Sequence, residues 1–342
     1  MVFFSSRESL LFFPFPVGMA DIGGTFMRTA LLQAQGAEAQ RLPDVRVSEG
    51  ADAALAISSA FAAAEASPRS LLVCAAGPVE GRSVQLTNAA WRIDGPGLAK
   101  AMHLDQGILL NDFEAQALSL PYLKTGWLRR IGSAKGEVLG PRLAHGPGTG
   151  LGTAALIEMD GKFLPLVSEA SHSDFAPATE RQRAYWPFIT QREGRITPET
   201  LISGPGLQRL HAARMALGGY QNAHDSSSQI IAAGCADPEG SEAETLREFW
   251  RLSARFAGDM ALAFMATGGV FLAGGLLPRM EPLLDETEFR RHFERRAPYT
   301  HIARKIPVFL ITGKDTVFAG LRALAESPED FALEKARLWR NS

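Results

Sequence analysis

A stretch with four glycines in seven residues, Gly146–Gly152 (GPGTGLG), constrains this chain more than any other feature. Glycine reaches positive φ at low cost and lets backbone N–H groups approach a ligand closely. Thr149 adds a hydroxyl group in the middle, the apolar run that follows predicts a strand, and Pro141–His145 is interpreted as a lead-in loop. The stretch is typical of a phosphate-binding hairpin, and equally of a plain glycine-rich hairpin.

Two common nucleotide-binding motifs are excluded at this stretch. A P-loop requires Lys and then Ser or Thr after its second glycine, and the stretch contains no lysine. A dinucleotide-binding fingerprint requires the spacing GxGxxG, which neither Gly146 nor Gly148 begins. Phosphate binding here therefore needs a different architecture, with partners from elsewhere in the chain.

Length and composition indicate a globular protein of ordinary solubility. The chain has 342 residues, enough for two domains, with 46% hydrophobic and 21% charged residues. Its net charge is −2 and it has no basic run, which argues against nucleic acid or a membrane as the main partner. Cys74 and Cys235 offer no disulfide framework and no zinc-site spacing, so we expect a reducing compartment and two core cysteines.

The order of predicted elements indicates two α/β domains after a loose N-terminal extension over residues 1–14. A small domain is expected over residues 15–121 and a large one over residues 122–317, with a C-terminal helix at about 318–340 returning to the small domain. In the small domain, strands are expected at Phe15–Ile22, Phe26–Leu32, Arg41–Val47, Leu71–Ala76, Val84–Thr87 and Gly107–Leu110, and helices at Ala51–Ala66, Gly97–His103 and Glu114–Leu120, with Asp94 as a cap.

The large domain is expected to open with a hairpin around the glycine-rich turn and to continue as a mainly helical half. Helices are predicted at Glu180–Trp186, Thr197–Leu201, Leu207–Leu217, Ser227–Gly234 and Ala243–Ala266, and late strands at Val270–Ala273 and Pro307–Ile311. Phe318–Ala325 begins the helical tail.

Carboxylates end two of the predicted strands of the small domain. Asp21 precedes Gly23, Gly24 and Thr25, where it can hold Mg²⁺ directly or through water, or act only as a turn former. Asn111 and Asp112 stand where a strand meets a helix. Asp112 can orient or deprotonate a substrate hydroxyl, which suits its usual pKa of about 3.9 if the transition state is loose; it can equally be a helix N-cap.

Polar residues of the large domain offer a second set of candidates. Glu169 and His172 are three residues apart, so both can face one cavity and bind sugar hydroxyls, or lie in a surface loop. Glu199 either favours a helix start by its charge or reaches the same cavity. Gly274 and Gly275 follow a strand, where they can let a base or ribose approach, or form an ordinary turn.

Taken together and in this order, these segments resemble the bacterial glucokinase family, within the larger group that shares the hexokinase, actin and Hsp70 ATPase fold. The resemblance covers nearly the whole chain from about Phe15, and both order and spacing agree. The segments that carry it are DIGGTFMR (Asp21–Arg28), AAGPVEG (Ala75–Gly81), TNAAW (Thr87–Trp91), LLNDFEAQA (Leu109–Ala117), GPGTGLGTA (Gly146–Ala154), EASHSDFAP (Glu169–Pro177), ETLISGPGL (Glu199–Leu207) and GGVFLAGGLLPR (Gly268–Arg279).

The resemblance implies a two-domain actin-like ATPase (ribonuclease H-like) fold, with mixed sheets flanked by helices and the active site in the interdomain cleft. It implies an ATP-dependent glucokinase that phosphorylates the 6-hydroxyl of glucose at the entry to glycolysis, with Mg²⁺, as a cytoplasmic homodimer. The related repressor and kinase group usually carries a cysteine-rich zinc loop after its histidine; this chain has none, which favours the glucokinase branch.

The resemblance also implies a role for each matching residue. Asp112 would be the general base, and Asp21 would position Mg²⁺, through water. The sugar would be bound by Asn111, Asp112, Glu169, His172 and Glu199. The phosphates of ATP would be held by Gly23, Gly24, Thr25, Gly148, Thr149 and Gly150, with Gly274 and Gly275 beside the adenosine.

Two departures from the family pattern leave alternatives open. Phe26 stands where the family usually has Asn after GGT, and Ala170–Ser171 replace two glycines between Glu169 and His172. A Cβ costs about 1–2 kcal/mol wherever such a position requires positive φ. The alternatives are a kinase for mannose, fructose or an amino sugar, and a degenerate sugar-binding protein without turnover; ADP or polyphosphate could replace ATP.

Overall fold

The computed structural model describes residues 12–47, 52–62, 64, 66–87, 89–136 and 140–340. Residues 1–11 of the expected extension, parts of the expected helix Ala51–Ala66, and Asn88 of the TNAAW segment lie outside these ranges. The chain forms two compact units. Unit 1 comprises residues 1–122, 159–165 and 315–342, and unit 2 comprises residues 123–158 and 166–314.

Unit 1 is built on a mixed seven-stranded sheet in the order β16-β9-β5-β1-β2-β3, with β4 also paired to β2. The three central strands β1, β5 and β9 are parallel and fully buried, and β2 lies antiparallel to β1. The strands are β1 (Val17–Ile22), β2 (Phe26–Leu32), β3 (Gln40–Arg41), β4 (Val45–Arg46), β5 (Ser70–Ala75), β9 (Gln106–Asn111) and β16 (Leu338–Arg340).

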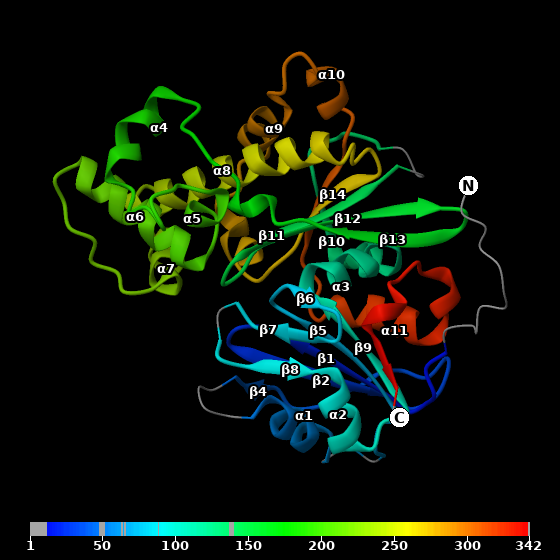
Figure 1. Ribbon diagram of the computed structural model, residues 1–342. Helices are drawn as coiled ribbons and strands as arrows, with labels where there is room; N and C mark the ends of the chain where they lie inside the picture. Colours follow the sequence, from blue (N-terminus) through cyan, green and yellow to red (C-terminus); the bar gives the residue numbers. More distant parts are fainter. Residues whose placement is uncertain are drawn as a thin grey trace. The chain divides into compact units, whose positions relative to one another are not determined.

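Helices cover both faces of this sheet, with α1 and α2 on one face and α3 and α11 on the other (Figure 1). They are α1 (Ala53–Ala62), α2 (Gly95–Met102), α3 (Asp112–Ser119) and α11 (Val317–Glu326). The predicted cap of α2 is confirmed, because the carboxylate of Asp94 accepts a hydrogen bond from Gly97 N. A separate three-stranded sheet is formed by β6 (Val79–Glu80), β7 (Ser83–Gln85) and β8 (Arg92–Asp94).

The C-terminal helix expected over about 318–340 is wrong beyond Glu326, where α11 ends. Pro328 has no N–H to donate and its ring clashes with the preceding helical turn, so the helix stops before it. The chain then reaches β16, which pairs antiparallel with β9. Trp339 is fully buried there against Gly107, whose added Cβ would lie 2.3 Å from the indole ring.

Other expectations for irregular segments also need correction. Residues 12–14 are not loose, because Phe13 is fully buried and Ser70 Oγ donates to the carbonyl of Pro14 at 2.8 Å. The third predicted strand is two short ones, β3 and β4, separated around Pro43, which has no N–H for a ladder. Pro141–His145 is not a loop; most of it belongs to strand β11.

Unit 2 carries most of a six-stranded mixed sheet in the order β10-β15-β14-β11-β12-β13. Strands β11, β14 and β15 are parallel, and β12 turns back antiparallel to β11. The strands are β10 (Leu128–Ile131), β11 (Arg142–Pro147), β12 (Leu151–Met159), β13 (Lys162–Val167), β14 (Gly269–Leu272) and β15 (Val308–Ile311). Strands β10 and β13 were not predicted from the sequence.

The helical half of unit 2 surrounds the long helix α8 (Ser241–Ala263), against which α6, α7 and α9 pack (Figure 1). The other helices are α4 (Glu180–Tyr185), α5 (Pro198–Leu201), α6 (Gly204–Leu217), α7 (Ser227–Ala236), α9 (Glu286–Glu294) and α10 (Thr300–Ala303). Buried aliphatic and aromatic residues of these helices and of β11, β14 and β15 form one continuous core. This core therefore supports the parallel strands and the turns that follow them.

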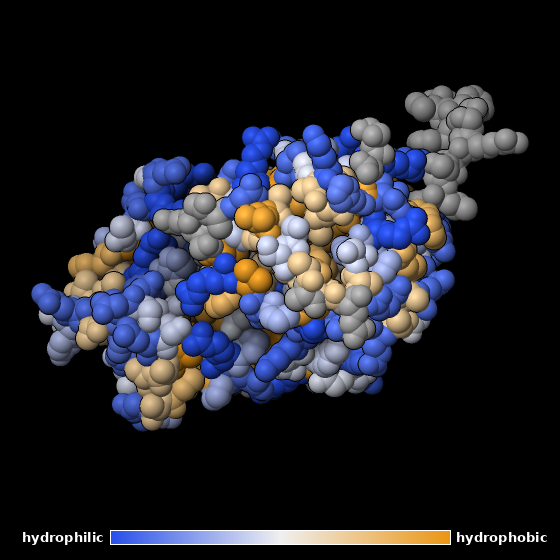
Figure 2. Space-filling view, turned by 90° about the horizontal axis from the view of Figure 1, so that it is seen from below, coloured by the Kyte–Doolittle hydropathy of each residue, from blue (hydrophilic) through white to orange (hydrophobic). Residues whose placement is uncertain are grey.

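No helix within the described ranges is both long enough and apolar enough to span a bilayer. On the face drawn in Figure 2, hydrophilic residues predominate and hydrophobic residues occur in small areas between them. Cys74 and Cys235 are free thiols, and only Cys74 is fully buried. The expectation of two core cysteines is therefore correct for Cys74, whereas Cys235 is partly exposed.

Candidate functional site

The candidate residues of unit 1 gather at the carboxyl ends of its parallel strands. In the register of the sheet, Ile22 pairs with Ala75, and Ala75 pairs with Asn111, so β1, β5 and β9 end level with one another. Asp21 therefore lies at the same edge as Asn111 and Asp112. Loops at this edge of a parallel sheet commonly form ligand sites, because several chain ends converge there.

Asn111 is the N-cap of α3. Its Oδ1 accepts hydrogen bonds from Phe113 N at 2.9 Å and Glu114 N at 3.2 Å, and its Nδ2 donates to the carbonyl of Gly77 at 3.1 Å. Glu114 completes a capping box by accepting from Asn111 N. Capping occupies most of this side chain, so only the second hydrogen of Nδ2 remains for a substrate.

Asp112 is the first residue of α3, so the interpretation of Asp112 as the N-cap is wrong. Its Oδ1 accepts from Phe113 N at 2.9 Å, and the carboxylate is only partly buried. Burial raises the pKa of the Cys74 thiol well above its usual value, and the negative charges of Asp21 and Asp112 raise it further. The carboxylates of Asp21 and Asp112 are therefore both close enough to Cys74 to raise the pKa of its thiol.

Arg28 is a residue of this edge to which the sequence interpretation gave no role. Asp21 is 5% exposed and forms an ion pair with Arg28, its antiparallel partner in β2, and accepts a weak hydrogen bond from Cys74 Sγ at 3.5 Å. The spacing of the hairpin could have indicated this pair, since a connection over residues 23–26 brings residue 21 opposite residue 28. Both oxygens of Asp21 have protein partners, so Asp21 does not fit a direct Mg²⁺ ligand, and a water-mediated contact would have to share the carboxylate with Arg28.

The turn from β1 to β2 keeps two N–H groups available. Gly23 N donates to the carbonyl of Phe26 at 3.0 Å, whereas the N–H groups of Gly24 and Thr25 have no partner within the described ranges. Phe26 is 45% exposed and its ring lies against the guanidinium of Arg46, 5.3 Å from centroid to Cζ. The turn uses only the backbone of position 26, so the phenylalanine leaves the turn intact.

In unit 2 the glycine-rich turn connects β11 to β12, as predicted. Gly148 N donates to Gly150 O at 2.8 Å, and no described residue accepts from the N–H of Thr149 or Gly150. An added Cβ on Gly148 would meet nothing within 4 Å. The turn therefore presents two unused donors beside open space, which is what a phosphate requires.

Two further backbone segments of unit 2 lie beside this turn. Gly204 N, at the start of α6, donates to Gly148 O at 2.9 Å. Gly274 has a φ of +85°, and its added Cβ would lie 2.4 Å from the carbonyl oxygen of Pro147. Gly274 thus needs to be glycine for both reasons, and the structure brings the two predicted nucleotide-binding stretches of this unit together.

The three predicted sugar ligands of unit 2 meet at His172. Its Nε2 lies 3.7 Å from Glu169 Oε2 and 3.9 Å from Glu199 Oε2. Glu169 directly precedes a short 3₁₀ turn over Ala170–His172, of which His172 is the last residue, and Glu199 belongs to α5. Residues from two separate stretches therefore form one polar cluster, in which Glu169 is exposed, His172 is about half exposed and Glu199 is nearly buried.

Glu199 connects this cluster to the glycine-rich turn. Its Oε2 accepts from Leu151 N at 2.9 Å, directly after the turn, and its Oε1 accepts from Arg192 Nη1 at 3.0 Å. Arg192 was missed by the sequence interpretation, because no motif contains it. Glu199 is thus oriented by a backbone donor and a cation, as a ligand for sugar hydroxyls should be.

The replacement of two glycines by Ala170 and Ser171 causes no backbone strain. Neither residue is among those with positive φ, and both lie in the 3₁₀ turn. Ser171 is 1% exposed, and its Oγ is buried without a partner in the described part of the chain. The condition under which a Cβ would be costly here, a positive φ, is therefore not met, and the Ser171 hydroxyl is not presented to solvent as a sugar ligand would be.

A hollow of about 980 Å³ on unit 2 lies elsewhere. It is lined by residues of α9 and of the chain around Gly132 and Thr300, with four arginines and two glutamates. None of the candidate residues lines it, and Arg290 within it already donates to the carbonyls of Ile306, Ala303 and Arg304. Its size alone does not make it the substrate site.

His145 supports the glycine-rich hairpin from inside the core. It is fully buried in β11, with its Nδ1 3.1 Å from Thr153 Oγ1 and its ring edge-on to Phe256 at 5.1 Å. Burial lowers the pKa of His145 to about 4, against a smaller opposing effect of a backbone hydrogen bond with Gly152. The imidazole is therefore neutral in the folded protein at pH 7.

We expect His145 to make the protein less stable in acid. Because the unfolded chain takes up this proton near pH 6.5 and the folded protein only near pH 4, stability is present above pH 6.5 and is lost as pH falls toward 4. Between pH 7 and pH 5 the wild type should lose about 2 kcal/mol more unfolding free energy than His145→Asn, measured by urea denaturation. The exposed His301→Asn should follow the wild type; equal losses in all three proteins would contradict the assignment.

Comparison with known proteins supports the interpretation of these stretches. The Glucokinase family model matches residues 19–328. A glucokinase of Sinorhizobium medicae (strain WSM419) is 36% identical over 330 residues, covering 96% of this chain and 97% of that protein. A glucokinase from an Antarctic psychrotroph has a solved structure with a TM-score of 0.77 and 28% identity, covering 91% of this chain and 98% of that one.

A more distant structure agrees in fold. A ROK family glucokinase from Streptomyces griseus, in complex with glucose and AMPPNP, gives a TM-score of 0.63 at 20% identity, over 91% of this chain and 99% of that one. The α/β architecture with mixed sheets flanked by helices is as predicted, and it is the actin-like ATPase fold of these sugar kinases. The chain belongs to the glucokinase family.

Proposed function

We propose that this chain is a glucokinase that transfers the γ-phosphoryl group of ATP to the 6-hydroxyl of glucose. The family match over residues 19–328 supports the reaction. The observation that carries the sugar-binding part is the convergence of Glu169, His172 and Glu199 in unit 2, from two stretches of sequence. Carboxylate and imidazole groups in such a cluster are suited to accept and donate hydrogen bonds to adjacent hydroxyls.

ATP and Mg²⁺ enter the proposal as one substrate, MgATP. A ROK family glucokinase has been solved with glucose and AMPPNP, which supports nucleotide use by relatives of this fold. The unused N–H groups of Thr149 and Gly150 in unit 2, and of Gly24 and Thr25 in unit 1, would bind phosphate oxygens. Gly274 and Gly275 would lie beside the adenosine. Asp21 remains the proposed carboxylate for Mg²⁺, through water and in competition with Arg28.

Asp112 is proposed as the general base, with Asn111 as a neighbouring sugar ligand. Asp112 is the first residue of α3, directly after the end of β9, and the N-cap of α3 is Asn111. The carboxylate of Asp112 is therefore not used for capping. In a loose phosphoryl-transfer transition state the hydroxyl loses its proton late, so a weakly basic group suffices. Orientation of the hydroxyl then contributes as much as proton removal.

A coupled assay of ADP formation tests the proposed substrate. With MgATP, we expect glucose to support turnover with a higher kcat/KM than mannose, fructose or glucosamine, since Ala170 and Ser171 leave the cluster unstrained. A clear preference for another of these hexoses would overturn the sugar assignment. Glucose binding in a calorimeter without ADP release would instead identify a sugar-binding protein without turnover.

Two properties implied by the family are further proposals. We propose a cytoplasmic enzyme and a homodimer; ultracentrifugation of the purified chain would report its oligomeric state directly.

Substituting ADP or polyphosphate for ATP in the coupled assay would test the phosphoryl donor. Turnover with either of them that equals turnover with ATP would change the donor assignment without affecting the sugar site.

A further inference from the structure

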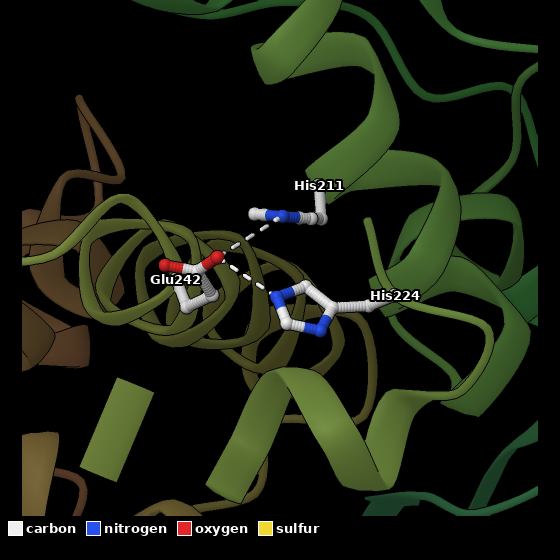
Figure 3. A group of neighbouring side chains, drawn as sticks. All are labelled: His211, His224 and Glu242. Carbon is white, nitrogen blue, oxygen red and sulfur yellow. Dashed lines mark hydrogen bonds and ion pairs between the residues drawn. The ribbon is translucent and has the colours of Figure 1, made fainter. Parts of the chain in front are cut away.

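Three ligand-type side chains converge in unit 2 outside the stretches assigned above. His211 projects from α6, His224 from the loop between α6 and α7, and Glu242 from the first turn of α8 (Figure 3). One nitrogen or oxygen from each lies within 4.8 Å of the other two. His224 Nε2 is 2.8 Å and His211 Nε2 is 3.8 Å from Glu242 Oε1.

The hydrogen bonds of Thr245 determine which nitrogen of His211 carries its proton. Thr245 Oγ1 donates to the carbonyl of Ser241 at 2.9 Å and accepts from Arg214 Nη1 at 3.1 Å. Its hydroxyl proton is therefore used, so toward His211 Nδ1, at 3.0 Å, it must accept. In neutral His211 the proton thus lies on Nδ1, and the lone pair of Nε2 points toward Glu242 and His224.

This arrangement places two acceptors face to face. The lone pair of His211 Nε2 and the carboxylate of Glu242 repel each other unless a proton or a cation lies near both. His211 is 1% exposed, so a proton added to its Nε2 would place a positive charge out of contact with water. Glu242 Oε1 faces the Nε2 atoms of both histidines, while Ser241 Oγ donates a hydrogen bond to Glu242 Oε2.

Two supporting contacts hold the ligands in position. Asn222 Oδ1 accepts from His224 N at 2.9 Å, and its Nδ2 donates to His224 O at 3.1 Å, which orients the loop. Ser241 Oγ donates to Glu242 Oε2 at 2.9 Å. In metal-binding histidines, the ring nitrogen that does not bind the metal commonly donates a hydrogen bond to a protein group. In His211 this nitrogen is Nδ1, which donates to Thr245 Oγ1.

We propose that His211 Nε2, His224 Nε2 and the carboxylate of Glu242 bind one divalent transition-metal cation of the zinc class. Zn²⁺ binds imidazole nitrogen and carboxylate oxygen at about 2.0–2.2 Å, so tetrahedral ligands stand about 3.4 Å apart. The observed separations bracket this value, and small side-chain shifts would reach it. The cation would take the place of the proton between His224 Nε2 and Glu242; in neutral His224 this proton passes through solvent to Nδ1, which frees the lone pair of Nε2. Water would supply the fourth ligand.

The donor set separates this site from the Mg²⁺ of MgATP. Magnesium prefers six oxygen ligands, whereas two imidazoles and one carboxylate suit zinc-class ions. A bound ion would join α6, the following loop and α8. His211 lies seven residues, or about 10 Å, along α6 from Gly204, which contacts the glycine-rich turn. The ion would therefore stabilise the segment that supports this turn without touching substrate.

The test uses the full-length chain without a histidine tag, stripped of metal with a chelator. Titration with Zn²⁺ by calorimetry, together with metal analysis after gel filtration, should give one Zn²⁺ per chain and a raised melting temperature. His224→Gln and Glu242→Gln should each weaken Zn²⁺ binding at least ~10-fold. His224 is chosen over the buried His211 because glutamine can keep a hydrogen bond to Glu242.

Two control variants show whether the ion sits at the proposed ligands. His301→Gln, at an exposed histidine, and His172→Gln, in the sugar cluster, should both bind Zn²⁺ like the wild type. Absence of stoichiometric Zn²⁺ binding by the wild type, unchanged binding by both site variants, or loss of binding in His172→Gln would each overturn the proposal.

Discussion

Replacing Asp112 by asparagine is expected to lower kcat for glucose phosphorylation at least ~10²-fold while the protein stays folded. The variant removes the charge and the basic oxygen and keeps the size of the side chain. Asparagine Oδ1 can still accept the hydrogen bond from Phe113 N, and the cap of α3 is supplied by Asn111. The loss should therefore appear in kcat, because the base acts in the transition state and not in the fold.

Asp94→Asn provides the matched control for this prediction. Asp94 also stands where a strand meets a helix in unit 1, between β8 and α2, and asparagine caps a helix as well as aspartate does. Both variants should show circular dichroism and urea midpoints close to the wild type, and only Asp112→Asn should lose turnover in the coupled assay. If Asp112→Asn keeps kcat within about threefold of the wild type, the base lies elsewhere.

Elements with strong local signals were predicted well from the sequence. The strand β2 (Phe26–Leu32) was predicted to the residue, and α8 to within three residues at each end, because alternation and helical spacing extend over whole elements. The short strand β16 could not be predicted, since three residues show no period and its partner β9 lies more than 200 residues earlier. Tertiary pairing, rather than local preference, decides such segments.

The candidate residues were found individually, but their partners were not. Motifs indicated Asp21 and Glu199, whereas Arg28 and Arg192, which pair with them, became evident only from the register of the β1–β2 hairpin and from the fold of the loop before α5. The reason for the glycines also differed from expectation. Gly146 does not adopt positive φ; its Cβ would instead lie 2.1 Å from the carbonyl oxygen of Ala273. Close packing, which sequence does not display, selects glycine there.

The glycines of the nucleotide-binding stretches should separate into two classes by their response to alanine. Gly274→Ala should lower the free energy of unfolding by about 3 kcal/mol, because a residue with a side chain is strained at φ +85° and its Cβ would overlap Pro147 O. Gly148→Ala should change stability by less than about 0.5 kcal/mol, since its Cβ would enter open space. Denaturant unfolding at pH 7 measures both values.

The Gly148→Ala variant also distinguishes a phosphate-binding turn from a glycine-rich turn with a structural role alone. If phosphate oxygens occupy the space beside Gly148, its new methyl group excludes them, and the KM for MgATP should rise at least ~10-fold while the KM for glucose changes little. Gly126→Ala, whose Cβ would also meet nothing within 4 Å, should leave both constants unchanged. A Gly148→Ala enzyme with the wild-type KM for MgATP would show that the open space is not where the phosphates bind, and the stretch would then be a structural turn.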